Sequence, residues 1–127
     1  MVYIFLLTTE ASDRTIAGYM KDLGLAFRQA TANALGDIDP AQVPVLRIKL
    51  SGTDDMLSMR ILAVGNITPE REQKLKEWSA YLSKAWRTFA NQHLVDWVDQ
   101  VDVCTVAING YSMMATETNV QKYLRFL

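Results

Sequence analysis

The chain has little of what most metal-binding, redox and secreted small proteins depend on. Cys104 is its single cysteine and His93 its single histidine. An internal disulfide is therefore excluded, and no Cys and His spacing typical of a zinc site is present. We expect a protein without metal or cofactor in a reducing compartment, which is the cytoplasm by default.

An excess of charge of one sign is also missing. The 13 basic and 14 acidic residues leave a formal charge of −1, and the basic residues are dispersed. A basic face for nucleic acid or anionic lipid is therefore not expected. The opening apolar run from Val2 to Leu7 is too short to span a bilayer, and no basic residues precede it as in a secretion signal. We interpret this run as a buried strand.

What is present indicates one globular domain. Half of the residues are apolar and only 21% are charged, which excludes disorder and allows a substantial core. Helical spacing predicts a long helix that starts at Ser12 or Asp13 and ends at Gly36, and a second one over 68–89. Apolar and β-branched runs predict strands at 2–8, 45–51, 58–64 and 101–109.

The order of these elements, β-α-β-β-α-β, predicts an α+β two-layer sandwich. We expect a four-stranded sheet with the two long helices on one face. The single domain, 1–127, would contain βαβ halves at about 1–51 and 58–110, followed by a C-terminal arm at 111–127. The first and fourth strands are apolar on both faces, so the face without helices should be apolar too. Such a surface predicts a homo-oligomer.

Four stretches carry a resemblance to a known family and together span the chain. They are a strand that begins at residue 2, the strand LRIKL with two basic residues, the turn VGNITPEREQKL and the closing TETNVQKYL. With these, the chain resembles the tautomerase superfamily, and within it the 5-carboxymethyl-2-hydroxymuconate isomerase group. The resemblance implies two βαβ units per protomer and a homotrimer that closes a barrel. The ferredoxin-like sandwich has the same order of elements and stays open as an alternative.

The resemblance also implies an isomerase that needs no cofactor. In that family an N-terminal proline, exposed by loss of the initiator Met, is the general base, and basic side chains hold the carboxylates of an enol acid. In this chain residue 2 is valine. The amine of Met1, or of Val2 once Met1 is removed, would have to act instead, and such an amine has a pKa of about 8. We therefore expect weak or absent activity.

Basic residues on two strands are the candidate carboxylate binders. Arg47 and Lys49 are two residues apart and share one face of a strand. We expect their apolar neighbours, Leu46, Ile48 and Leu50, to face the helices, which would turn the basic pair toward the open face. Arg60 would join the pair, and Tyr3 or Phe5 would form the pocket wall. One contact is missing, because Ile67 stands where the family tends to have an arginine.

The residues leave two functions open. The first is a tautomerase-like isomerase of a small keto/enol carboxylate. The second is a non-catalytic oligomer of tautomerase or ferredoxin-like fold that binds a small anion or a partner chain. In the second case Arg47 and Lys49 would be rim charges that keep the sheet from aggregating. His93, near the end of the second helix, is expected to cap or pack that helix end. Cys104, in an apolar strand, is expected to be a buried, inert thiol.

Overall fold

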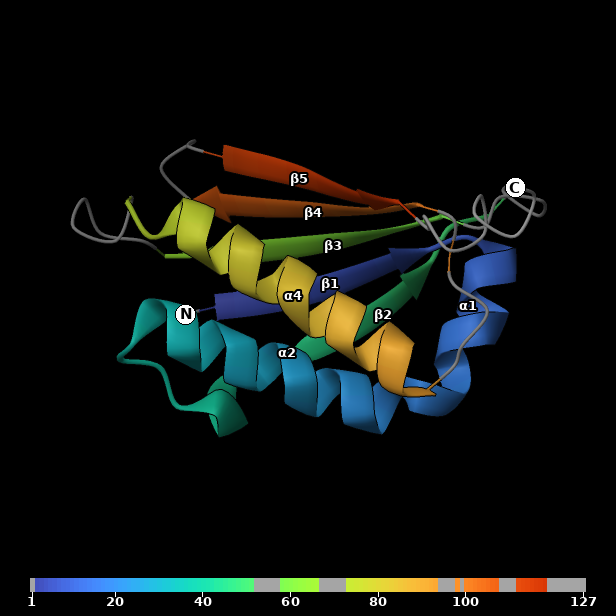
Figure 1. The fold of residues 1–127 in the computed structure, drawn as a ribbon, viewed down its shortest axis with the longest axis horizontal. Coiled ribbons are helices and arrows are strands. Elements are labelled where there is room, and N and C mark those ends of the chain that lie inside the picture. The colour runs from blue at the N-terminus through green and yellow to red at the C-terminus, as the bar shows by residue number, and fades with distance from the viewer. Residues whose placement is uncertain are drawn as a thin grey trace.

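In the computed structural model, the protein consists of a five-stranded mixed sheet with helices on one face (Figure 1). The structure describes residues 2–51, 58–66, 73–93, 98, 100–107 and 112–118. The strands are β1 (Val2–Thr8), β2 (Val45–Lys49), β3 (Ser58–Gly65), β4 (Gln100–Ala107) and β5 (Ser112–Thr118). The helices are α1 (Glu10–Ile16), α2 (Met20–Leu35) and α4 (Leu75–His93), with short 3-10 turns at Ala17–Tyr19 and Pro40–Gln42.

The order of strands across the sheet, β2-β1-β3-β4-β5, decides between the two folds left open by the sequence. β1 is parallel to β2, β3 is parallel to β4, and the two pairs meet where β1 runs antiparallel to β3. The two strands of each βαβ unit therefore lie side by side. A ferredoxin-like sandwich has split units, in which another strand lies between them. The ferredoxin-like alternative is wrong.

The sheet has five strands, so the prediction of four strands is wrong. β5 lies within the predicted C-terminal arm and pairs antiparallel with β4, with Gln100 opposite Thr118. An ion pair of 2.6 Å between Arg87 Nη1 of α4 and Glu117 Oε1 joins the C-terminal end of β5 to that helix. Antiparallel pairing of this kind needs only a short connection and backbone hydrogen bonds. Such a strand forms without the long apolar run by which the other strands were predicted.

The first helical segment begins earlier than expected and is interrupted. Thr9 is its cap: Thr9 Oγ1 accepts from the Ser12 N–H (3.1 Å), and Ser12 Oγ accepts from the Thr9 N–H (2.8 Å). The prediction of Ser12 or Asp13 as the cap is wrong, because Ser12 is the reciprocal partner in this capping box. The predicted end at Gly36 is confirmed by its φ of 85°. The predicted start of the second helix, at Thr68, lies outside the described residues.

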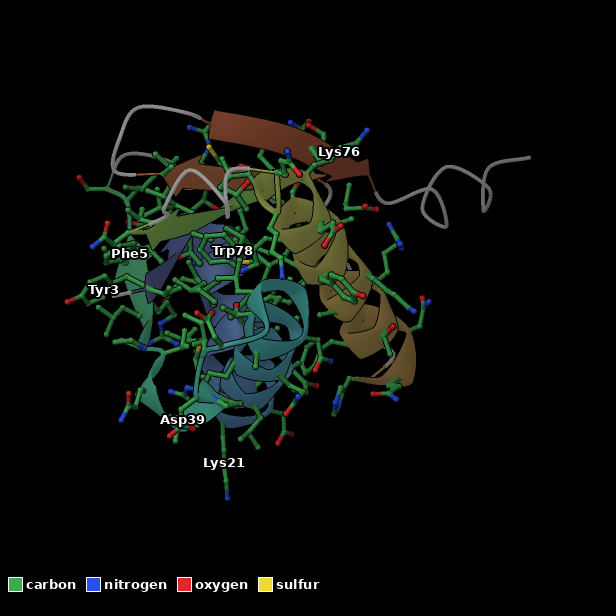
Figure 2. All side chains as sticks on the ribbon, turned by 90° about the vertical axis from the view of Figure 1, so that its left-hand side faces the viewer. Tyr3, Phe5, Lys21, Asp39, Lys76 and Trp78 are labelled. Atoms are coloured by element: carbon green, nitrogen blue, oxygen red, sulfur yellow. The ribbon has the colours of Figure 1, made fainter. Side chains whose placement is uncertain are left out.

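The core lies between the sheet and the pair of helices α2 and α4. Val2, Ile4 and Leu6 of β1 point into it and are buried. Trp78 of α4 is also fully buried, and Figure 2 shows it between the two layers. Its indole Nε1–H donates to Thr31 Oγ1 of α2 (2.9 Å), so a buried hydrogen bond joins the two helices. Within the described part of the chain, no helix has the length and apolar character needed to cross a bilayer.

The opposite face of the sheet, which no helix of the described residues covers, carries apolar side chains on β1, as predicted. Tyr3 and Phe5 lie on it with their rings stacked at 6.2 Å, and Figure 2 shows both pointing away from the helical layer. Leu46 and Ile48 of β2 are 48% and 43% exposed there. The register adds Leu7 of β1, Leu62 and Val64 of β3, and Cys104 and Val106 of β4. Cys104 is only partly buried on this face, so the prediction of a buried thiol is wrong. This surface is called the open face below.

Candidate functional site

The expected catalytic end of the chain lies at the start of β1. Val2 is 3% exposed, faces the helical layer and pairs with Gly65 at the end of β3. Met1 lies outside the described residues. Tyr3, the next residue, is half-buried on the open face opposite Val64. The chain therefore starts at the margin of the open face where β3 ends, and Tyr3 lies beside this start.

Arg47 and Lys49 do not lie on the open face, so the predicted orientation of this pair is wrong. In the parallel pairing of β1 with β2, Arg47 lies beside Leu6 and Lys49 beside Thr8, both of which face the helices. Arg47 Nε is 3.1 Å from Oδ1 of Asp13 on α1. The physical reason is that an acidic partner lies on the helical side, whereas the apolar neighbours of Arg47 extend the open face.

Arg60 does lie on the open face. It is opposite Leu7 of β1 and beside Asp102 of β4. Its Nη2 is 3.6 Å from Asp102 Oδ2, and the Arg60 side chain is 52% exposed. Guanidinium donors thus remain accessible to a ligand, because a single carboxylate at this distance does not use all five of them.

Asp102 is held in place by neutral donors from two strands. Thr116 Oγ1 of β5 donates to Asp102 Oδ1 at 3.0 Å, and Gln100 Nε2 donates to the same oxygen at 3.2 Å. Arg60 and Asp102 line a cavity of about 410 Å³, here called the Arg60 pocket. Its other lining residues are Leu7, Thr9, Leu50, Ser58, Met59 and Gln100. Its described lining residues combine one accessible cation, a hydrogen-bonded carboxylate and an apolar side.

One chain does not bring the Arg60 pocket and the chain start together. Val2 is level with Gly65 and Leu7 is level with Arg60. Five steps along a strand correspond to about 17 Å. A small keto acid does not span this distance. Of the predicted site residues, Val2 and Tyr3 lie at one end of the sheet and Arg60 at the other, while Arg47 and Lys49 lie on the opposite face.

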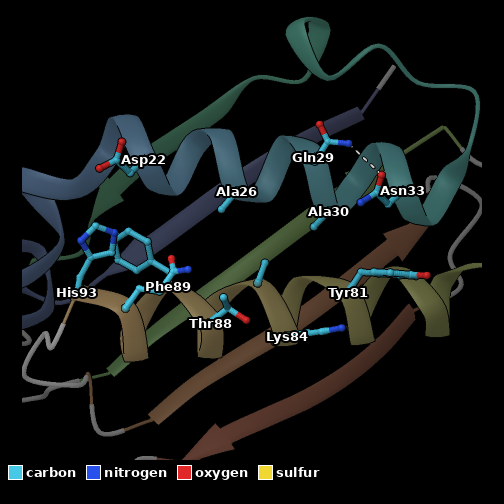
Figure 3. A pocket seen from close by; sticks show the side chains of 12 residues that line it. Asp22, Ala26, Gln29, Ala30, Asn33, Tyr81, Lys84, Thr88, Phe89 and His93 are labelled. Atoms are coloured by element: carbon cyan, nitrogen blue, oxygen red, sulfur yellow. Dashed lines mark hydrogen bonds between the residues drawn. The ribbon is translucent and has the colours of Figure 1, made fainter.

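A second cavity lies between α2 and α4, on the side of the helices away from the sheet (Figure 3). It measures about 520 Å³, and His93 lines one end of it. His93 packs against Phe89 at 4.4 Å and Tyr19 at 5.3 Å between ring centroids, which confirms its predicted packing role. Among the described residues, no three His, Cys, Asp or Glu side chains are placed to hold a metal ion.

Sequence reasoning missed Asp102 and its partners Gln100 and Thr116. The signal was present, because Asp102 is the one charged residue in the strand from Val101 to Ala107. A carboxylate in such a strand needs partners on its own face. Gln100 and Thr116 provide them, but Thr116 belongs to β5, which was not predicted.

Comparisons with known proteins show the fold. No protein-family model matches the chain, and no curated protein does. Among solved structures it is similar to Pt0534, seen after inactivation by 2-oxo-3-pentynoate, with 18% identity, a TM-score of 0.55, and 84% of this chain and 85% of that one covered. It is also similar to native Ps01740 (16%, 0.44; 84% and 93%). A third is macrophage migration inhibitory factor of Toxoplasma gondii (17%, 0.39; 83% and 88%).

The likeness to Pt0534 covers most of both chains and is a likeness of fold. Together with the adjacent βαβ units, it supports the α+β fold of two βαβ units expected from the sequence. The resemblance to the tautomerase superfamily, and within it to the 5-carboxymethyl-2-hydroxymuconate isomerase group, stays a prediction. The chain has an α+β fold similar to that of Pt0534, and its sheet has five strands among the described residues.

Proposed function

We propose that this protein is a tautomerase-like isomerase of small keto/enol carboxylates, which works without cofactor and only weakly. The observation that carries the proposal is the position of β1, which begins at residue 2 and holds the chain start at the edge of an uncovered apolar face. An amine at such an edge meets substrate that enters over the face. The activity is weak because Val2 stands in place of the expected proline.

The site we propose uses two copies of the chain. Within one chain the amino group and Arg60 are about 17 Å apart, by the spacing of residues along a strand. The open face is apolar, and covering it with further copies removes Tyr3, Phe5 and Leu62 from water. We propose that this contact brings the chain start of one copy to the Arg60 pocket of another. The resemblance favours a trimer.

The proposed chemistry moves one proton. During ketonisation the enol hydroxyl loses a proton and the neighbouring carbon gains one, so the amine accepts the first and its ammonium form returns one to carbon. The guanidinium of Arg60 holds the carboxylate with up to two hydrogen bonds and exchanges no proton. With a pKa of about 8, only about a tenth of the amine is in its basic form at pH 7, which limits the rate.

An enol-to-keto assay with phenylpyruvate, on protein shown by mass spectrometry to lack Met1, tests the proposal. We expect a slow rate above that of buffer, lost after acetylation of the amino terminus and in Arg60→Ala. Lys49→Ala is the matched control, since Lys49 lies on the helical face, and it should keep the rate. A rate equal to that of buffer would overturn the proposal.

A second candidate is a non-catalytic assembly that binds a small anion. It is favoured by the ion pair between Arg47 and Asp13, which removes one of the expected cations from the site. It predicts carboxylate binding that depends on Arg60 and no turnover. The same protein preparations distinguish the two candidates when binding and rate are both measured.

A further inference from the structure

We infer that Asp102 makes the Arg60 pocket selective for monocarboxylates with an apolar body and causes it to reject dicarboxylates. This inference rests on the proposed function, from which it takes the Arg60 pocket as the carboxylate site. It goes further by naming the substrate class and the residue that sets it.

The charges of the pocket allow for one carboxylate. Among the described residues that line it, Arg60 is the cation and Asp102 the anion. The exposed part of the Arg60 side chain is available to a first carboxylate. Within one chain, a second carboxylate on the same small ligand meets no further cation among the described lining residues and lies near Asp102, where like charges repel.

Asp102 moves away from such a ligand only by breaking two hydrogen bonds, so the repulsion is not relieved without cost. Gln100 and Thr116 both donate to its Oδ1, at 3.2 and 3.0 Å. Its side chain is only 21% exposed. The carboxylate is thus fixed beside Arg60 before any ligand arrives.

The other strand cations do not compensate. Arg47 lies on the helical face, 3.1 Å from Asp13, and Lys49 shares that face. The family resemblance suggested these two residues as carboxylate binders. Their orientation removes that contact from the open face of the chain.

The remaining surface of the pocket suits an apolar body. Leu7 and Leu50 line it, and Leu50 is 43% exposed. Phe5 continues the same face of β1 beyond Leu7. A volume of about 410 Å³ is enough for a ring-bearing carboxylate. Burial of that ring against leucine side chains contributes to binding, whereas a second charge in its place does not.

Phenylacetate and phenylmalonate are the matched probes, because they share the ring and differ by one carboxylate. Binding to the full chain is followed by NMR titration at low ionic strength. We expect phenylacetate to bind at least about fivefold more tightly than phenylmalonate, as one screened like-charge contact of about 1 kcal/mol implies. Asp102→Asn should remove most of this preference, and Arg60→Ala should weaken both probes. Asp22→Asn is the control, because Asp22 lines the other cavity.

The binding readout separates this inference from the proposed function. Selective, Arg60-dependent binding without any isomerase rate would overturn the isomerase and leave the inference standing. Equal binding of both probes, no binding of phenylacetate, or an unchanged preference in Asp102→Asn protein that folds as the wild type would overturn the inference, even in an active enzyme.

Discussion

Arg47 Nε lies 3.1 Å from Asp13 Oδ1, and this ion pair joins the edge strand β2 to helix α1. Thr8 Oγ1, at the end of β1, donates to the same carboxylate oxygen at 2.9 Å. Asp13 therefore holds the ends of two parallel strands against the helix that follows the first of them. This is a structural role for Arg47, one of the residues expected to bind substrate.

The first prediction concerns this pair. Arg47→Ala should lower the free energy of unfolding by about 0.5–1 kcal/mol, because the partners are partly exposed and screened by solvent. It should leave phenylacetate binding unchanged. Urea unfolding and the NMR titration check the two parts. Lys49→Ala is the control for loss of a cation on the same strand, and a loss of phenylacetate binding in Arg47→Ala alone would contradict the assignment.

The second prediction concerns the base. Val2→Pro, in protein that lacks Met1, should raise the rate of phenylpyruvate ketonisation by at least about tenfold, since a better placed general base contributes strongly. The wild-type rate should itself rise between about pH 7 and pH 9, as the primary amine loses its proton. Val2→Ala keeps a primary amine and should behave as the wild type. Equal rates for Val2→Pro and Val2→Ala would show that the amino terminus is not the base.

The third prediction concerns the open face. Phe5→Glu places a charge on the apolar surface beside Tyr3 and should reduce the mass of the assembly in sedimentation experiments. Leu25→Glu is the matched control, because Leu25 lies on α2 and is already 57% exposed. Circular dichroism establishes that both variants fold. Identical masses for the two variants would locate the contact between copies elsewhere.

The fourth prediction concerns the buried bond between helices. Thr31→Val removes the oxygen that accepts from Trp78 Nε1 and leaves a fully buried donor without its partner. We expect a loss of about 1–3 kcal/mol in the free energy of unfolding. Thr15→Val is the control, since Thr15 Oγ1 donates to the Ala11 carbonyl of its own helix and does not join two elements among the described residues. It should change stability by no more than about 0.5 kcal/mol.

Local patterns in the sequence predicted most of the fold. The turn at Gly36, the buried face of α4 around Trp78 and the apolar strand at Val2–Thr8 each follow from neighbouring residues alone. The orientation of β2 does not. Alternation shows that Arg47 and Lys49 share a face, but the choice of face depends on Asp13, which is distant in sequence. A pattern within one strand contains no information about such a partner.

The Arg60 pocket was predictable only in part. Its charge alone makes Arg60 a candidate for carboxylate binding. Its position beside Asp102 follows only from the pairing of β3 with β4. The partner of Asp102 on β5, Thr116, lies in a segment expected to be an arm. Polar networks that cross several strands become visible only when the order of the strands is known.

The sheet ends in two unlike edges, β2 on one side and β5 on the other. β2 runs parallel to its neighbour, and β5 runs antiparallel to its own. A contact between the edge strand β2 of one subunit and the edge strand β5 of the next would be heterologous. Each subunit added in this way leaves the same edge strand free for another one. Growth through such a contact ends only when the rotation closes a ring.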